Sequence, residues 1–333
     1  MKRRAGLLYR VVGALAVCSL GAGCEPASRA EPPSASSSVR SAPGVKRSFA
    51  RARAAFQTEV NSIPSTEAPP PEPPGELFER VHYPGPLGDY WAYVSPPDAD
   101  PDTRQPLVIW RTGGFGGGIG AIAWAEPDLA NDQSGRQYRL AGAAMMYPSL
   151  RGSHDNPGSS EGFFGEVDDL LAAVEYARSL EHVDPERVYL AGHSTGGTLV
   201  LLAAALLPEG KVHGVIALGP IALISEYGED WMPFDPGNRD EVAMRSPLVW
   251  LDSIKTPTYV FEGTAGNIEP LQGMKRRNSN PCVQFFPVRS HDHFSAIASL
   301  NELVARYIMG HVDASTPLVF GQEELQKIST PQR

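Results

Sequence analysis

Short apolar runs alternate with helical patterns along most of the chain. Buried strands are predicted at 107–110, 141–150, 187–192, 212–219, 256–263 and 283–288. Helical spacing of apolar residues is found between them, at 121–129, 166–180, 195–207, 269–277 and 294–309. Two earlier strands, 79–84 and 90–95, flank a PGPLGD turn. The alternation predicts an α/β fold whose mostly parallel sheet is covered by helices on both faces.

One stretch breaks the alternation of strands and helices. Residues 224–251 follow a predicted strand and contain Trp231, Met232, Phe234 and Trp250. They are expected to lie above the carboxyl edge of the sheet as a cap-like insert. An apolar cap over a pocket suggests a substrate with an apolar portion.

Composition and charge narrow the class of protein. Hydrophobic residues make up 42% of the 333 residues, which is enough for a real core. The net charge of -9 argues against nucleic acid as a partner, because nucleic-acid binders usually carry a basic stripe. Three Cys exclude a disulfide-rich scaffold and a four-Cys zinc site.

The first 23 residues are typical of a secretory signal peptide. Lys2, Arg3 and Arg4 precede an apolar, Gly- and Ala-rich run that is short for a membrane span. The run ends in LGAGC, which resembles a bacterial lipoprotein cleavage site and makes Cys24 the candidate lipidation site. The expected location is the bacterial cell envelope, with the membrane contacted through a lipid at Cys24.

Residues 24–75 are rich in Pro, Ser and Ala and are predicted to form a tether. Within them, residues 45–62 could form a short amphipathic helix on the membrane surface or on the domain, or a solvated linker helix. The folded domain is predicted to span 76–315, and a C-terminal tail 316–333.

The motif GHSTG points to a nucleophilic serine. It lies directly after an apolar strand and directly before a helix, the context that the G-x-S-x-G motif requires. Gly192 and Gly196 leave room for a sharp turn, and Ser194 is pushed above the sheet at a helix N-terminus. Ser194 is therefore the candidate nucleophile.

A serine nucleophile needs a base and an oxyanion hole. The segment after the last strand supplies His291 and His293, of which His293 is favoured because it lies nearest the start of the helix. The backbone amides of Thr195 and of Gly114 or Phe115, in the loop TGGFGGG, are the candidate oxyanion donors.

Cofactor and metal sites lack support in the sequence. The glycine-rich loop at 113–120 matches neither a dinucleotide-binding fingerprint nor a Walker A motif, so no cofactor is expected. The H-x-H at His291 and His293 has no companion cluster, and no metal is expected.

Several segments together resemble the α/β-hydrolase superfamily, in particular its prolyl oligopeptidase-like and dienelactone hydrolase-like members. They are WRTGGFGGG, YPSLRGSHDNPG, FGEVDDLLAAVEYARS, VDPERVYLAGHSTGG, TPTYVFEGT and HDHF. The resemblance covers about 230 residues and implies an eight-stranded α/β-hydrolase fold. Prolyl oligopeptidases also carry a large N-terminal propeller, and a tether stands in its place here.

The triad acid departs from the family pattern. After the penultimate strand the family has Asp in G-T-x-D, whereas this chain reads EGTAGN with Gly266 in that position. Glu262, Glu269 and Asn267 remain as candidates, and Glu262 is preferred because a strand end is held more rigidly than a loop.

These features predict an exported serine hydrolase of esterase or peptidase type. It would cleave a small-molecule ester or amide, or a peptide, through an acyl-enzyme on Ser194 with His293 as base. The alternative hypothesis is a non-catalytic or weakly active binding protein of the same fold at the cell envelope, supported by the missing Asp.

Overall fold

The computed structural model describes residues 48–61, 68–98, 103–311 and 316–328. The predicted signal peptide, Cys24 and the tether up to residue 47 lie outside the described residues. None of the helices in the described ranges is both long and apolar enough to span a membrane.

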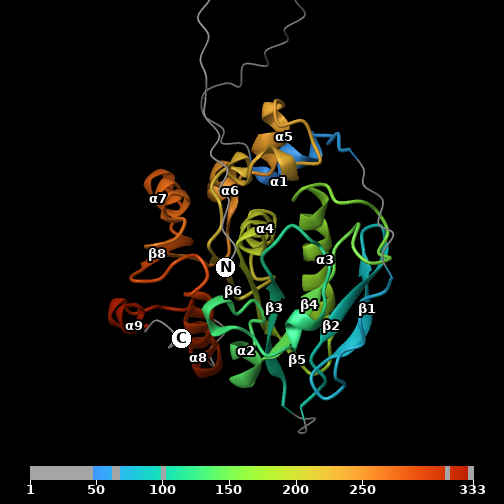
Figure 1. The fold of residues 1–333 in the computed structure, drawn as a ribbon, viewed down its shortest axis with the longest axis vertical. Coiled ribbons are helices and arrows are strands. Elements are labelled where there is room, and N and C mark those ends of the chain that lie inside the picture. Colours follow the sequence, from blue (N-terminus) through green and yellow to red (C-terminus); the bar gives the residue numbers. More distant parts are fainter. Residues whose placement is uncertain (1–47, 62–67, 99–102, 312–315, 329–333) are drawn as a thin grey trace, which may run out of the picture. The chain divides into compact units, whose positions relative to one another are not determined.

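One eight-stranded sheet forms the centre of the molecule (Figure 1). Its strands are β1 (Glu79–Gly85), β2 (Gly88–Val94), β3 (Gln105–Arg111), β4 (Ala144–Pro148), β5 (Val183–His193), β6 (Gly214–Leu218), β7 (Thr258–Gly263) and β8 (Val283–Val288). They lie in the order β1-β2-β4-β3-β5-β6-β7-β8. β1 and β2 pair antiparallel, as do β2 and β4, and the other pairs are parallel. The predicted mostly parallel sheet is confirmed.

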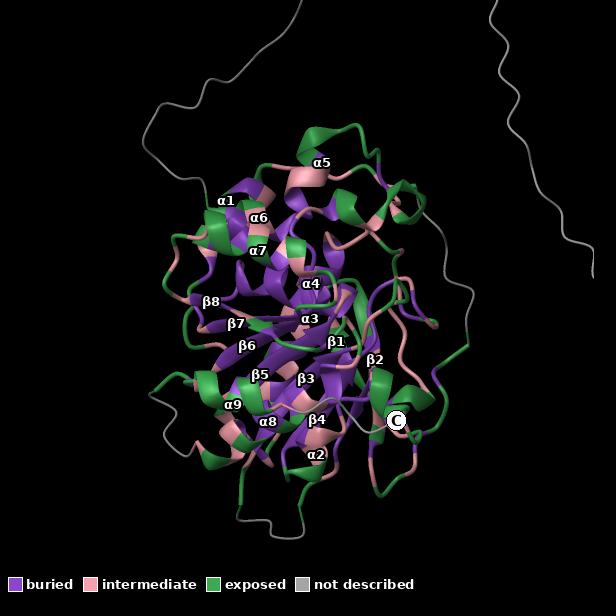
Figure 2. Ribbon diagram, turned by 60° about the vertical axis from the view of Figure 1, so that its left-hand side comes forward, coloured by how far each residue is buried: buried purple, intermediate pink, exposed green. Residues whose placement is uncertain are grey.

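Helices cover both faces of the sheet, which is buried between them (Figure 2). The helices are α1 (Phe49–Ala54), α2 (Gln137–Leu140), α3 (Gly165–Ser179), α4 (Thr195–Ala204), α5 (Arg239–Met244), α6 (Pro247–Trp250), α7 (Ile268–Arg277), α8 (Ile297–Gly310) and α9 (Gln322–Lys327). In β5, Val188 and Leu190 pack on the side of α3 and α4, whereas Tyr189 and Ala191 pack on the side of α8. This alternation explains why the parallel strands are apolar on both faces.

The helix predicted at 121–129 is wrong. The chain forms two single 3₁₀ turns there, Ala121–Ala123 and Leu129–Asn131. Pro127 lacks an N–H for a continuous helix, and the Asp128 side chain accepts from the N–H of Ala130, which begins a new turn.

The folded domain includes residues outside the predicted 76–315. Phe49 of α1 is fully buried and stacks on Trp250 with ring centroids 4.7 Å apart. At the other end Leu318 and Phe320 are buried against the sheet side that carries α8. Residues 48–61, expected in the tether, and 316–328, expected as a tail, are therefore packed parts of the domain. Among the options for 45–62, the described part lies on the domain.

Candidate active site

The strand register brings the candidate residues to one edge of the sheet. Arg111, the last residue of β3, pairs with Gly192, and His193 at the end of β5 pairs with Leu218 at the end of β6. Gly263 of β7 pairs with Val288 of β8. Because these strands are parallel, the segments that follow β3, β5, β6, β7 and β8 all leave at the same edge.

Ser194 sits in a strained backbone turn between β5 and α4. Its φ of 55° and ψ of -115° lie in a region that residues with a side chain rarely adopt. The turn is so tight that a Cβ on Gly192 would come 2.6 Å from the carbonyl carbon of Gly196. These two positions therefore require glycine, and the strained turn presents Ser194 at the N-terminus of α4.

His293 contacts Glu262 directly. Nδ1 of His293 lies 2.9 Å from Oε2 of Glu262, whose side chain is only 2% exposed. The imidazole also packs against Gly219, where a Cβ would come 2.5 Å from Cε1. The Ser194 N–H donates to the carbonyl of Leu218, the residue before Gly219, so the serine turn and the His293 ring both adjoin the end of β6. Among the described residues no hydrogen bond joins the Ser194 hydroxyl to His293, and such contacts often tighten only when substrate binds.

The structure gives a physical reason for the glycine in the family's acid position. A Cβ on Gly266 would lie 2.5 Å from Oε1 of Glu262 and 2.5 Å from the backbone nitrogen of His293. The loop that carries His293 therefore leaves no space for a side chain there. The carboxylate comes instead from Glu262, the penultimate residue of β7.

Among the described residues, no hydrogen bond joins Glu269, Asn267 or His291, the other candidates from the sequence, to the His293 ring. Glu269 and Asn267 are exposed near the start of α7. His291 is fully buried, and neither of its ring nitrogens has a hydrogen-bond partner within the described ranges. Asp292 is exposed and accepts from the N–H groups of Phe294 and Ser295, and these hydrogen bonds lower its pKa.

The glycine-rich loop after β3 lies against the nucleophile turn. The Thr195 hydroxyl donates to the carbonyl of Gly114 at 2.5 Å. Thr195 is the first residue of α4, so its backbone N–H has no partner within the helix. Thr195, Gly114 and Phe115 all line one cavity, which brings the three predicted oxyanion donors to a common space.

Aromatic side chains form the upper wall of this cavity. Phe115 stacks on Trp231 of the insert with centroids 4.5 Å apart and an interplanar angle of 5°. Trp231 is 60% exposed, so this wall borders solvent. Of the other apolar insert residues expected over the pocket, Phe234 and Trp250 are buried in packing clusters.

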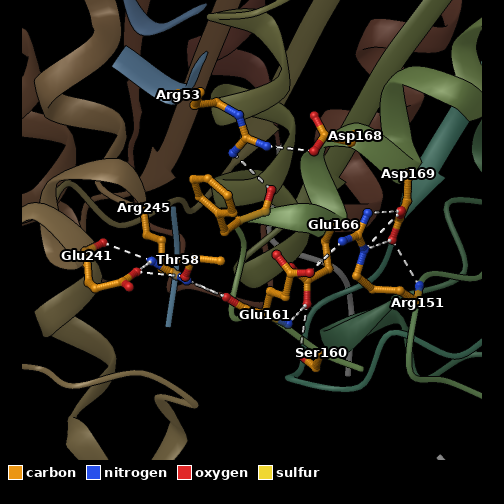
Figure 3. Close-up of polar contacts among 11 residues, drawn as sticks. Arg53, Thr58, Arg151, Ser160, Glu161, Glu166, Asp168, Asp169, Glu241 and Arg245 are labelled. Atoms are coloured by element: carbon orange, nitrogen blue, oxygen red, sulfur yellow. Dashed lines mark hydrogen bonds and ion pairs between the residues drawn. The ribbon is translucent and has the colours of Figure 1, made fainter. Parts of the chain in front are cut away.

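Three buried charged side chains, Arg111, Arg151 and Glu166, also line the cavity. Arg111 donates to the carbonyl of Pro148 at 2.6 Å, and burial lowers its pKa to about 10. Glu166 accepts from the Ser160 hydroxyl and the N–H of Glu161, and burial raises its pKa (Figure 3). The polar side of the cavity therefore holds both signs of charge.

A polar network attaches the insert to two earlier parts of the chain. Arg245, which follows α5, is fully buried and pairs with Glu241, and it donates to Thr58 and to the carbonyl of Glu161 (Figure 3). Arg53 of α1 pairs with Asp168 of α3 at 2.7 Å. The segment 48–61 thus helps to hold the insert that carries Trp231.

One residue near the site, Gln133, had no signal in the sequence and belongs to no motif. Arg111 and Glu166 lie in segments that carried the family resemblance, but only the folded structure places them at the cavity. Gln133 lies in a stretch without periodicity, yet it contacts the N–H of Gly113 and the ring of His193. Within the described ranges, no group of three or more His, Cys, Asp or Glu is placed to hold a metal ion.

Comparison with known sequences relates the chain to hydrolases. A family model described as alpha/beta hydrolase fold matches residues 112–245. The chain is 25% identical over 222 residues to dipeptidyl aminopeptidase BIII of Pseudoxanthomonas mexicana, covering 58% of this chain and 31% of that protein. It is 28% identical over 153 residues to a probable carboxylesterase of Oryza sativa, covering 43% of this chain and 51% of that protein. The chain thus spans about a third of the first relative and half of the second.

Solved structures share the fold. An acylaminoacyl peptidase of Pyrococcus horikoshii superimposes with a TM-score of 0.56 at 16% identity, covering 75% of this chain and 44% of that one. An esterase of Pyrobaculum calidifontis superimposes with a TM-score of 0.53 at 17% identity, covering 71% and 86% of the two chains. The sheet order, the strained serine turn and the matching family model together show that this chain has the α/β-hydrolase fold.

Proposed function

We propose that the protein is a serine hydrolase that cleaves an ester or amide through an acyl-enzyme on Ser194. The observation that carries the proposal is the 2.9 Å contact between His293 and Glu262, at the edge where the strained turn presents Ser194. A nucleophile, a base and a group that orients the base are the parts that this chemistry requires.

The reaction follows from these positions. Ser194 Oγ attacks the carbonyl carbon of the substrate while Nε2 of His293 takes its proton, and Glu262 stabilises the imidazolium through Nδ1. The negative charge on the carbonyl oxygen is held by the N–H of Thr195 and that of Gly114 or Phe115. His293 then protonates the leaving alcohol or amine, and a water molecule releases the acyl group by the reverse sequence.

The cavity wall suggests which part of the substrate is apolar. Phe115 and Trp231 offer flat aromatic surface next to the proposed oxyanion donors. An apolar or aromatic group beside the scissile carbonyl fits this wall. A small ester, a small amide and a short peptide all satisfy this requirement, in keeping with the peptidases and carboxylesterases to which the chain is similar.

Labelling with a fluorophosphonate probe tests the proposal. The wild-type protein is expected to react at Ser194 and to hydrolyse p-nitrophenyl acetate, and Ser194→Ala is expected to do neither while keeping its thermal unfolding midpoint. An unlabelled wild-type protein, under conditions in which a control hydrolase reacts, would contradict the proposal.

The alternative of a non-catalytic binding protein is not favoured. It depended on the absence of Asp at position 266, and Glu262 provides a carboxylate to His293 in its place.

The proposal extends to the location of the protein. The basic and apolar start of the chain and the LGAGC segment support export and lipidation at Cys24 in a bacterial cell envelope. Metabolic labelling with a palmitate analogue is expected to mark the wild-type protein and not Cys24→Ser. Labelling of both proteins, or of neither, would contradict lipidation at Cys24.

A further inference from the structure

A chain of hydrogen bonds crosses the base of the site and touches three loops. The N–H of Gly113, in the glycine-rich loop, donates to Oε1 of Gln133 at 2.9 Å. Nε2 of Gln133 lies 2.9 Å from Nδ1 of His193, the residue before Ser194. Nε2 of His193 lies 2.9 Å from the carbonyl oxygen of His293. Gln133 and His193, which have no role in the proposed reaction, thus connect three segments: the glycine-rich loop after β3, the turn at Ser194, and the loop that carries His293.

The partners fix which nitrogen of His193 carries the proton. The carbonyl oxygen of His293 can only accept, so Nε2 of His193 must donate. Oε1 of Gln133 faces the N–H of Gly113, and Nε2 of Gln133 also donates to Oδ1 of Asn131 at 2.7 Å. Nδ1 of His193 lies 2.9 Å from this amide nitrogen and 3.2 Å from Oε1. Because the single proton of a neutral ring is on Nε2, Nδ1 accepts from the amide nitrogen.

A protonated His193 fits these contacts less well than a neutral one. An imidazolium would place an N–H on Nδ1, whose nearer neighbour is the amide nitrogen of Gln133, a donor, at 2.9 Å; Oε1 lies at 3.2 Å and already accepts from Gly113. The residue is 1% exposed, so water does not supply a better acceptor. Burial, together with the neighbouring His293, lowers the pKa of His193 to about 3. The ring therefore stays neutral over the pH range in which a histidine base works.

We propose that Gln133 and His193 are positioning residues. They hold the glycine-rich loop and the loop that carries His293 in fixed positions relative to Ser194. This inference depends on the proposed hydrolase function. The reacting groups lie on loops that follow different strands, and small displacements of such groups lower the rate strongly. A rigid neutral bridge between the backbones of Gly113 and His293 removes that freedom without placing a charge beside the base.

Matched variants of His193 separate positioning from folding. Replacement by Phe keeps the ring and removes both hydrogen bonds, and we expect the labelling rate by a fluorophosphonate to fall about 100-fold. Replacement by Gln keeps a donor that can reach the carbonyl of His293, so at least a tenth of the wild-type rate is expected. His213→Phe is the control, since His213 contacts the ring of Tyr189 outside the candidate active site. Its labelling rate is expected to match that of the wild type.

The pH dependence of the labelling rate is a second measurement. A purely structural role of Gln133 and His193 would leave it unchanged. In Gln133→Glu the carboxylate can accept from Gly113 and from Nδ1 of His193, so the bridge remains while His193 becomes an imidazolium. The His293 ring has Glu262 at Nδ1 and His193 at a centroid distance of 4.6 Å, with the Asp292 carboxylate turned to backbone N–H groups. The new cation disfavours protonation of His293. The pH of half-maximal labelling is therefore expected to fall by about half a unit or more.

The outcomes distinguish this inference from the proposed function. A wild-type protein that is not labelled would overturn the hydrolase function and this inference with it. A labelled wild type whose His193→Phe and Gln133→Glu variants keep both its rate and its pH midpoint would overturn this inference alone. If His193→Phe does not fold, the pH midpoint of Gln133→Glu decides. A nitrogen NMR spectrum of the wild-type imidazoles is a check without activity: a His193 ring that titrates near pH 6.5 would also overturn the inference.

Discussion

At the residue scale, the carboxylate that meets His293 comes from within a strand and not from the loop that follows it. Glu262 is the penultimate residue of β7, and its backbone is fixed by pairing with Pro287 of β8. The longer side chain of Glu, relative to Asp, reaches the imidazole from this earlier position. Gly266, where the family has Asp, lies directly against the backbone of His293. The carboxylate at Glu262 and the glycine at position 266 therefore depend on each other: the strand supplies the acid because the loop has no room for one.

Exchange of the acid between the two positions tests this arrangement. Glu262→Ala is expected to lower the rate of p-nitrophenyl acetate hydrolysis by about 10³- to 10⁴-fold, because His293 loses the group that orients it. Adding Gly266→Asp is expected to restore nothing, since any side chain at 266 meets the backbone nitrogen of His293. The control Glu269→Ala, at an exposed position on α7, should keep the wild-type rate. If the double variant recovered toward the wild-type rate, an acid at position 266 would be able to replace Glu262, which would contradict this arrangement.

At the element scale, a short helix far outside the predicted domain stabilises the insert over the cavity. α1 places Phe49 against Trp250 of α6 and Arg53 against Asp168 of α3. The segment after it gives Glu59 N–H and the Thr58 hydroxyl to Glu241, which pairs with the buried Arg245. The insert that carries Trp231 is thus held by contacts from residues 48–61, which lie nearly two hundred positions earlier in the chain.

Phe49→Ala measures the contribution of α1. The ring is fully buried, so its loss should lower the free energy of unfolding by about 3 kcal/mol, as for other Phe-to-Ala changes in cores. Arg51→Ala, on the exposed side of the same helix, should change it by less than about 0.5 kcal/mol. Urea denaturation followed by tryptophan fluorescence gives both values. Equal values for the two variants would mean that α1 does not contribute to the stability of the core.

At the scale of the whole molecule, both flanks of the predicted domain complete its core. α1 covers the sheet side that carries α3 and α4, and Leu318, Phe320 and Leu325 cover the side that carries α8. Phe320 packs edge-on against Tyr259 and Phe261, with centroids 5.1 and 5.4 Å apart. Removing these flanks would expose apolar surface on both sides of the sheet.

Two truncated chains test these limits. A chain of residues 46–333 is expected to unfold at the same urea concentration as the full-length protein. A chain of residues 76–315, the limits predicted from the sequence, loses Phe49, Leu318 and Phe320. Its expected loss of several kcal/mol is comparable with the whole stability of a typical domain, so it should aggregate or unfold. Equal unfolding midpoints for the two chains would contradict the placement of the flanks in the core.

The sequence alone determined the sheet, because parallel strands buried on both faces appear as short apolar runs and each crossover helix has its own periodicity. It also indicated Ser194 as the candidate nucleophile, since a strained strand-to-helix turn leaves a local glycine signature. It pointed to His293 and Glu262 as further candidates by their places after and within predicted strands. Only the tertiary structure decided that Glu262 meets His293, that Gln133 and His193 bridge the loops, and that residues 48–61 and 316–328 pack on the domain and add Phe49, Leu318 and Phe320 to its core. The reason is physical: a turn is specified by its own residues, whereas a contact between distant segments depends on where the sheet brings them together.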